Sequence, residues 1–174
     1  MPTIGVAVDI PEPFGSYLQE RREHFGDPLA YAIPPHITLL PPTEVAEDEL
    51  AAVEAHCVAV AAAADAFTVE LTGTGTFRPV SPVVFVRVTR GMDECARMEQ
   101  AIRSGPIERP LDFDYHPHVT IAHHVSEAQL DVAEAGLATF TGAFVARAVH
   151  LYHHGADEIW RPVVAFELGR QTAP

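Results

Sequence analysis

Hydrophobic and polar positions follow two different spacings along this chain. Stretches in which every second residue, or nearly every residue, is apolar are typical of strands, whereas apolar residues three or four positions apart are typical of helices. Gly26 marks the end of the first helical stretch, and acidic residues after Thr43 mark the start of the second. The elements predicted in the first half are a strand at 4–10, a helix at 14–26, a strand at 37–40, a helix at 43–64 and a strand at 67–73. The strand at 37–40 lies between prolines, which we expect to end its pairing.

The second half repeats this order of elements. They are a strand at 83–89, a helix at 91–104, a short strand at 118–121, a helix at 126–137 that opens on a capping-box pattern, and one strand at 144–154. The first strands begin 79 residues apart, the histidines of the short strands lie 82 apart and the second helices begin 83 apart. A last strand at 163–168 would complete a sheet. The spacing therefore predicts an internal duplication of a β-α-β-α-β unit.

The duplication predicts an α+β fold. A linker rich in Gly, Thr and Pro at 73–82 separates the repeat halves, about 1–78 and 79–174. Neither unit alone covers a sheet face cheaply, so we expect the halves to pack about a pseudo-twofold axis as one two-lobed domain over 1–174. Antiparallel sheets would then face a central cleft, with equivalent residues of the two halves opposite each other.

Composition excludes several classes of protein. The 174 residues are 48% hydrophobic, which is enough for a sizeable core. No stretch approaches the roughly 18 apolar residues that a membrane helix needs, and the N-terminus has no basic segment before an apolar run. We expect a cytoplasmic monomer with no membrane partner. Cys57 and Cys95 fall in predicted helices and form no C-x-x-C pattern, so we expect two buried thiols.

The charge of the chain limits its substrates. Twenty-four acidic residues oppose eleven basic ones, for a formal net charge of -13, and there is no lysine. A protein that grips a long nucleic-acid backbone needs many cationic contacts to phosphate, and here the basic residues include a single arginine pair, Arg21-Arg22. Long nucleic acid is therefore not an expected partner. A small nucleotide, or one RNA terminus, needs only a few local donors.

The two halves carry the same tetrapeptide pattern at equivalent positions. It reads His36-Ile37-Thr38-Leu39 in the first half and His118-Val119-Thr120-Ile121 in the second. Side chains alternate between the faces of a strand, so each histidine lies on the same side as its threonine. One such tetrapeptide means little, but two at matching points of a duplication favour a shared site over two unrelated buried histidines.

With these motifs the chain resembles the 2H phosphoesterase superfamily, also called the bacterial 2'-5' RNA ligase-like or cyclic phosphodiesterase family. The resemblance covers nearly the whole chain and rests on PPHITLL and HPHVTIA. It implies a duplicated two-lobed α+β fold with His36 and His118 as the catalytic pair, and with Thr38 and Thr120 binding phosphate oxygens. It further implies His36 as acid and His118 as base.

The chemistry of the residues agrees with this expectation. Opening a 2',3'-cyclic phosphate requires a base for water on one side of phosphorus and an acid for the departing ribose oxygen on the other. Imidazole, with a pKa near 6.5, serves in either role, and threonine hydroxyls donate to the non-bridging oxygens. We expect a metal-independent phosphoesterase that acts on a 2',3'-cyclic phosphate or a 2'-5' phosphodiester without a cofactor, and whose reaction is reversible toward RNA ligation.

Four further residues are candidates for substrate contacts. Phe77 and Arg78 lie in the linker, which borders the cleft in the resembling family; Phe77 would stack on a base and Arg78 would pair with phosphate. Tyr31 precedes the first motif and Tyr115 the second, so both are candidate rim residues.

Two alternatives stay open at this point. A metal-dependent phosphoesterase could use the histidines near the second motif and near the end of the chain, although no carboxylate partner stands at a recognisable spacing. These histidines are His116, His123, His124, His153 and His154. The other alternative is a nucleotide-binding module without turnover, but binding alone does not require both an acid and a base.

Overall fold

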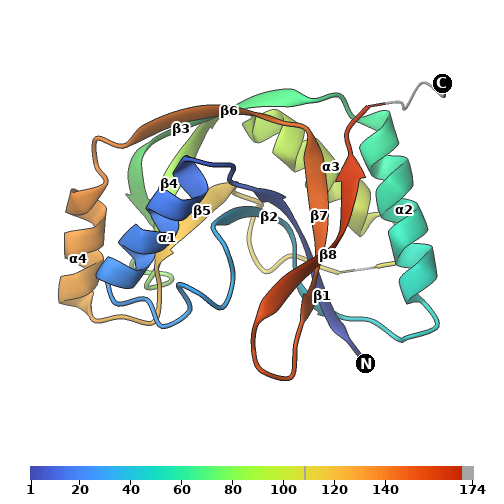
Figure 1. Cartoon of the computed structure of the whole chain (residues 1–174), viewed down its shortest axis with the longest axis horizontal. Coiled ribbons are helices and arrows are strands. Elements are labelled where there is room, and N and C mark those ends of the chain that lie inside the picture. The colour runs from blue at the N-terminus through green and yellow to red at the C-terminus, as the bar shows by residue number, and fades with distance from the viewer. Residues whose placement is uncertain (108, 170–174) are drawn as a thin grey trace.

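Two four-stranded antiparallel sheets and four helices make up the part of the chain that the computed structural model describes, residues 1–107 and 109–169 (Figure 1). One sheet has the strand order β2-β1-β7-β8 and the other β5-β4-β3-β6. In chain order the elements are β1 (Thr3–Asp9), α1 (Phe14–His24), β2 (His36–Glu44), α2 (Leu50–Ala63), β3 (Phe67–Thr76), β4 (Val84–Arg90), α3 (Met92–Arg103), β5 (His118–Ala122), α4 (Glu127–Gly136), β6 (Thr141–Ala146), β7 (Ala148–His154) and β8 (Trp160–Glu167).

The expected α+β class is confirmed, and the two sheets are related as the duplication predicts. The strands that carry the histidine motifs, β2 and β5, occupy equivalent edges of the two sheets. However, each sheet takes strands from both halves of the sequence: β3 pairs with β4 and β6, whereas β7 pairs with β1. The boundary between the sheets therefore does not follow the linker at 73–82, and the sequence halves are interleaved.

The prediction that prolines end the first motif strand at residue 40 is wrong. Strand β2 continues through Pro41 and Pro42 to Glu44, and Thr43 pairs with Ile4 of β1. Proline is tolerated here because β2 is an edge strand, and because the register with β1 shifts beside the two prolines. As a result α2 begins at Leu50 instead of position 43.

The stretch predicted as one strand at 144–154 forms two strands in different sheets. Ala146, at the end of β6, pairs with Phe67 of β3, whereas Ala148, at the start of β7, pairs with Glu167 of β8. The chain thus passes from one sheet to the other at Arg147 (Figure 1). The helix predicted at 126–137 is confirmed, and its capping box forms between Ser126 and Gln129.

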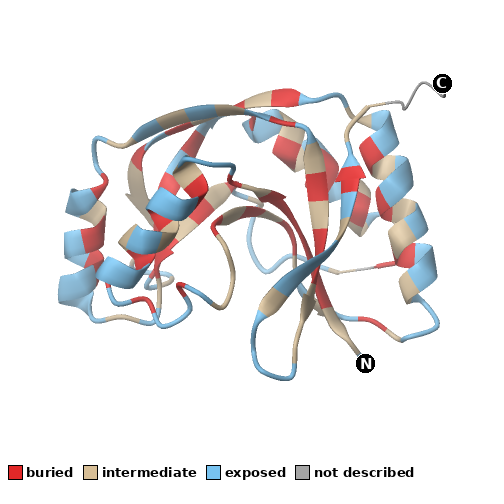
Figure 2. Cartoon of the chain, viewed as in Figure 1, coloured by how far each residue is buried: buried red, intermediate tan, exposed pale blue. Residues whose placement is uncertain are grey.

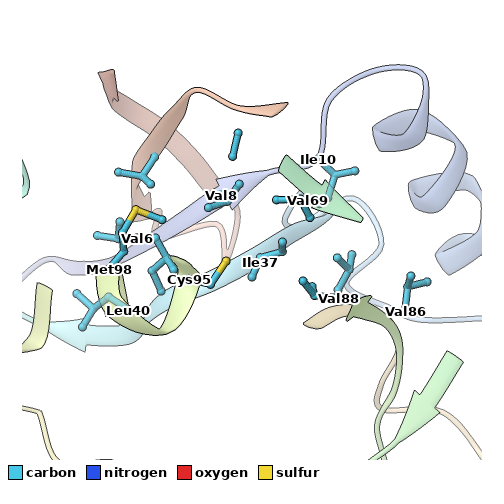
Figure 3. Close-up of a cluster of buried hydrophobic side chains, with 14 of the residues drawn as sticks. Val6, Val8, Ile10, Ile37, Leu40, Val69, Val86, Val88, Cys95 and Met98 are labelled. Atoms are coloured by element: carbon cyan, nitrogen blue, oxygen red, sulfur yellow. The ribbon is translucent and has the colours of Figure 1, made fainter. Parts of the chain in front are cut away.

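Two helices cover each sheet. Helices α2 and α3 pack on the sheet of β2 and β8, and helices α1 and α4 pack on the sheet of β5 (Figure 1). Their outer faces are exposed, and so is most of β6 and β8 at the outer sheet edges, whereas the inner strand β1 is largely buried (Figure 2). Side chains from both sheets, among them Val8, Ile37 and Val88, belong to one hydrophobic cluster (Figure 3). Within the described ranges, no helix is long and apolar enough to cross a bilayer.

Both cysteines are buried free thiols, as expected. Burial raises the pKa of Cys57 to about 11 and that of Cys95 to about 12. The sulfur atoms therefore stay protonated at neutral pH and act as small apolar groups of the core.

Candidate active site

The two histidine motifs lie at the facing edges of the two sheets. Strands β2 and β5 are in contact, and each begins with its histidine, His36 or His118. The apolar residues of the motifs, Ile37 and Val119, are fully buried. His36, Thr38, His118 and Thr120 are half-buried, as the alternation of strand side chains predicts.

A pocket of about 350 Å³ opens beside the motifs, a size within the usual range of ligand sites. His36, Thr38 and Thr120 line it, so the structure brings together residues that lie more than 80 positions apart in the sequence. His118 is not one of the lining residues, but it lies two positions before Thr120 on β5 and therefore on the same face of that strand.

Both catalytic candidates make the same hydrogen bond through the same ring nitrogen. The Nδ1 atom of His36 lies 2.8 Å from the Pro34 carbonyl oxygen, and Nδ1 of His118 lies 2.7 Å from the His116 carbonyl oxygen. A carbonyl oxygen only accepts, so Nδ1 carries a proton in each ring. Nε2 is then the nitrogen that each ring offers for exchanging a proton with a substrate.

Burial keeps both imidazoles neutral at neutral pH. It lowers the pKa of His36 to about 4, an effect to which the positive charge of Arg22 contributes. Burial also lowers the pKa of His118, whose hydrogen bond to His116 is more exposed. The bonds to the carbonyl oxygens oppose these shifts because they favour the protonated rings.

The ring of Phe77 packs against that of His118. Its ring centroid lies 4.9 Å from that of His118, with the two rings perpendicular, and 4.4 Å from that of Phe85. The ring of Phe85 also lies 5.2 Å from that of His118, so two phenyl rings pack against this imidazole. Phe77 thus packs against a catalytic candidate, and stacking on a base remains a prediction.

The structure does not support the prediction that Arg78 binds phosphate. Its guanidinium forms ion pairs with three carboxylates of α4, those of Glu127, Asp131 and Glu134, at 2.7 to 3.0 Å. These contacts raise its pKa further above the usual value. Arg78 therefore fastens the linker to α4, where its charge is already compensated.

The two tyrosines next to the motifs make contacts within the protein. Tyr31 is exposed and its hydroxyl donates to Glu23 at 2.8 Å. The Tyr115 hydroxyl donates to the backbone carbonyl of Thr38 at 2.8 Å, which links the segment before β5 to β2. Tyr115 thus positions the phosphate-binding candidate of the other sheet, a role that differs from the predicted rim contact.

Sequence reasoning did not place Arg22, Asp27 or His123 at this pocket, although it considered His123 as a possible metal ligand. Arg22 and Asp27 form a buried ion pair at 3.1 Å, and Arg22 also donates to the Leu29 and Ile33 carbonyl oxygens. The pair holds the segment that leads to His36. One signal was available, because Arg22 stands four positions after Leu18 on the buried face of α1, where an apolar residue is expected.

His123 contributes a third imidazole to the pocket. Its ring stacks on that of His124 at a centroid distance of 3.6 Å, and His124 has a positive φ of 58°. Across the described ranges, no three His, Cys, Asp or Glu side chains converge as a set of metal ligands.

Comparison with known proteins identifies the family. The model of the 2'-5' RNA ligase superfamily matches residues 10–158. The chain belongs to the 2'-5' RNA ligase superfamily. This result confirms the resemblance to the 2H phosphoesterases and makes the chain a phosphoesterase homologue over most of its length.

Relatives of this superfamily member carry the name "Putative phosphoesterase". One from Halalkalibacterium halodurans is 25% identical over 169 residues, covering 96% of this chain and 98% of its own. One from Bacillus licheniformis is 32% identical over 101 residues, which is 58% of this chain and 59% of that protein.

Solved structures share the fold. A Thermus thermophilus protein, TT0787, superposes with a TM-score of 0.70 at 21% identity, covering 99% of this chain and 100% of its own. Escherichia coli LigT complexed with 3'-AMP superposes with a TM-score of 0.68 at 18% identity, covering 97% of this chain and 99% of its own.

The buried Arg22–Asp27 pair predicts a specific pattern of stability. Asp27→Asn should lower the free energy of unfolding by about 3–5 kcal/mol, because it leaves a buried guanidinium without its counter-charge. Removing both charges in Arg22→Met/Asp27→Leu should cost less than Asp27→Asn. Urea denaturation compares both variants with the wild type, and Arg161→Ala is the matched control with only a small loss, because the side chains of Arg161 and its partner Asp157 are both more than half exposed. A double variant less stable than the single one would contradict this account.

The low pKa of His36 predicts a loss of stability in acid. The unfolded chain takes up a proton at His36 near pH 6.5, whereas the folded chain does so only near pH 4, so this contribution is complete above pH 6.5 and is lost as the pH falls toward 4. Between pH 7 and pH 4, wild type should lose roughly 2–3 kcal/mol more free energy of unfolding than His36→Gln. Parallel pH dependences for the two proteins would show that His36 titrates normally in the folded state.

Proposed function

We propose that this protein is a metal-independent phosphodiesterase that opens a 2',3'-cyclic phosphate, or cleaves a 2'-5' phosphodiester, at an RNA end or in a small nucleotide. The observation that carries the proposal is the matched pair of imidazoles, His36 and His118, each fixed by Nδ1 to a carbonyl oxygen two residues earlier. Their strands are in contact, and His36 lines one pocket together with Thr38 and Thr120. Binding alone has no need of two such groups.

The reaction needs one proton removed and one supplied. Water attacks phosphorus and gives a proton to Nε2 of the neutral imidazole, while the bond from phosphorus to the departing ribose oxygen breaks and that oxygen takes a proton from Nε2 of the other. This second imidazole enters the step protonated on both nitrogens, a state that the negative charge of the bound phosphate stabilises. The product is a phosphate monoester on one ribose oxygen and a free hydroxyl on the other. By microscopic reversibility the two imidazoles exchange their roles in the reverse reaction, and the same site would catalyse ligation where a 5'-hydroxyl takes the place of water as the nucleophile.

The surroundings of the two rings favour His36 as base and His118 as acid for ring opening. His36 lies in the pocket near the positive charge of Arg22, and its pKa of about 4 keeps it in the neutral form that a base requires, with the Nε2 lone pair free. His118 has the more exposed ring hydrogen bond and keeps a proton more readily. This assignment is the reverse of the order that the family resemblance implies.

The pocket suits a substrate with a single negative charge. Thr38 and Thr120 offer hydroxyls to the non-bridging oxygens, and His123 offers a third imidazole. The charge of Arg22, which lines the same pocket, is paired with Asp27. A phosphodiester monoanion therefore matches the site better than the more highly charged monoester product, which favours product release.

Small nucleotides are the partners that these observations support. The described pocket has room for one small molecule, and the net charge of -13 opposes a long RNA backbone. Structures of the similarly folded E. coli LigT with 3'-AMP, NADP+ and ATP support the same choice. A nucleotide-binding module without turnover remains the alternative that the first experiment below separates.

Loss of either histidine should remove most of the activity. His36→Ala and His118→Ala should each lower kcat/KM for a 2',3'-cyclic mononucleotide by roughly 10²- to 10⁴-fold, and the double variant should be little worse than the worse single one. The exposed His24→Ala is the matched control and should behave as wild type. All variants should be assayed with and without EDTA, which should have no effect. Activity that disappears with EDTA and returns with a divalent ion would refute the metal-independent mechanism.

An activated leaving group distinguishes the acid from the base. An aryl phosphodiester with p-nitrophenolate as leaving group needs no proton on departure, so a variant that lacks the acid should regain activity on it. We expect His118→Ala to approach wild-type kcat/KM on this ester to within about tenfold, while His36→Ala stays impaired by roughly 10²-fold or more. The opposite pattern would assign His36 as the acid and restore the order implied by the resemblance.

A further inference from the structure

The pocket beside the histidines has a second, apolar end. Its polar end consists of His36, Thr38, Thr120 and His123, and its other end includes Gly5, Ala7, Leu40, Pro42 and Trp160. Leu40 and Pro42 follow Thr38 at every second position of β2, so they lie on the same face of the sheet. The apolar end therefore continues directly from the candidate phosphate site.

Small residues of β1 make this end shallow and flat. At Gly5 the backbone is bare, and a Cβ atom there would lie 3.3 Å from Trp160 Cζ3 and 3.3 Å from the Leu40 carbonyl oxygen. The indole thus lies directly against the backbone of β1. Ala7, two residues further along this strand, also has a small side chain and lines the same end of the pocket. A side chain larger than glycine at position 5 would push the indole away from the sheet.

Trp160 is held in place from two sides. Its ring lies 4.8 Å from that of His154, tilted by 33°, across the β7–β8 pair. Its backbone N–H donates to the Ala32 carbonyl oxygen at 2.7 Å, in the segment that leads to His36. The indole is half-buried, so part of its surface faces the pocket. These two contacts fix the indole relative to β7 and to the segment that leads to His36.

We propose that Trp160 is the stacking platform for the base of a nucleotide whose phosphate lies between His36 and His118. This inference rests on the proposed function and makes it more specific, since it assigns the substrate class as a nucleoside phosphate and not a ribose phosphate without a base. A nucleobase is planar and stacks on an aromatic ring with little dependence on which base it is. Phe77, the stacking residue expected from the sequence, packs against His118, whereas Trp160 lines the pocket itself.

The kinetic test compares two substrates that differ only in the base. They are adenosine 2',3'-cyclic phosphate and the methyl riboside 2',3'-cyclic phosphate, in which a methoxy group replaces adenine. Trp160→Ala should raise KM for the adenosine substrate by roughly 10- to 100-fold and should change the methyl riboside by no more than about twofold. Trp160→Phe should retain most of the affinity because it keeps an aromatic face. Equal losses on both substrates, or no loss on either, would overturn the proposal.

A binding test keeps the inference separate from turnover. Trp160 is the single tryptophan of the chain, so its fluorescence reports on its own surroundings. Excited outside the absorption band of the base, it should be quenched by 3'-AMP in a saturable manner and should be unaffected by ribose 5-phosphate. Quenching by 3'-AMP in a protein that turns over neither cyclic phosphate would preserve the platform while refuting the proposed function. Absence of quenching at saturating 3'-AMP would refute the platform alone.

Discussion

The hydrogen bond from each imidazole Nδ1 to a backbone carbonyl two residues earlier controls what this site is able to do. It fixes which ring nitrogen is protonated and how the ring is turned, and it uses only backbone that the strand start already supplies. Burial acts against it by disfavouring the charged ring. In the protein without substrate this balance leaves both imidazoles neutral, because the pKa of each lies below its usual value.

Two polar contacts near the pocket hold the motif strands in position. Tyr115 donates across to the Thr38 carbonyl, and the ion pair of Arg22 with Asp27 stabilises the approach to His36. Neither contact needs to touch a substrate to matter, because in-line displacement is sensitive to small errors in position. The buried charges thus belong to the positioning of the site and not to the neutralisation of its ligand.

The sequence predicted those features that depend on local pattern. Alternation along a strand placed each histidine beside its threonine, and the duplication placed the two motifs opposite each other. Features that depend on tertiary partners were not predictable in this way. Pro41 and Pro42 fit a strand only because β2 is an edge strand. Arg78 pairs with three carboxylates of α4, a helix some fifty residues later in the chain. The charge of Arg22 is tolerated in the interior because Asp27 is buried beside it. The position of Trp160 at the pocket was not predictable because a single aromatic residue in a strand belongs to no repeating pattern.

The passage of the chain between the sheets at Arg147 has a consequence for how the protein is made. Strand β1 pairs with β7, so Thr3 cannot form its backbone pairing until His154 has been synthesised, and Ala7 cannot do so until His150 has been synthesised. Pairings across so much sequence are slow to form, and on the ribosome they are impossible until nearly the whole chain has emerged. During synthesis β1 therefore exposes an apolar edge, and the site is assembled among the last parts of the molecule, when β7 closes the first sheet.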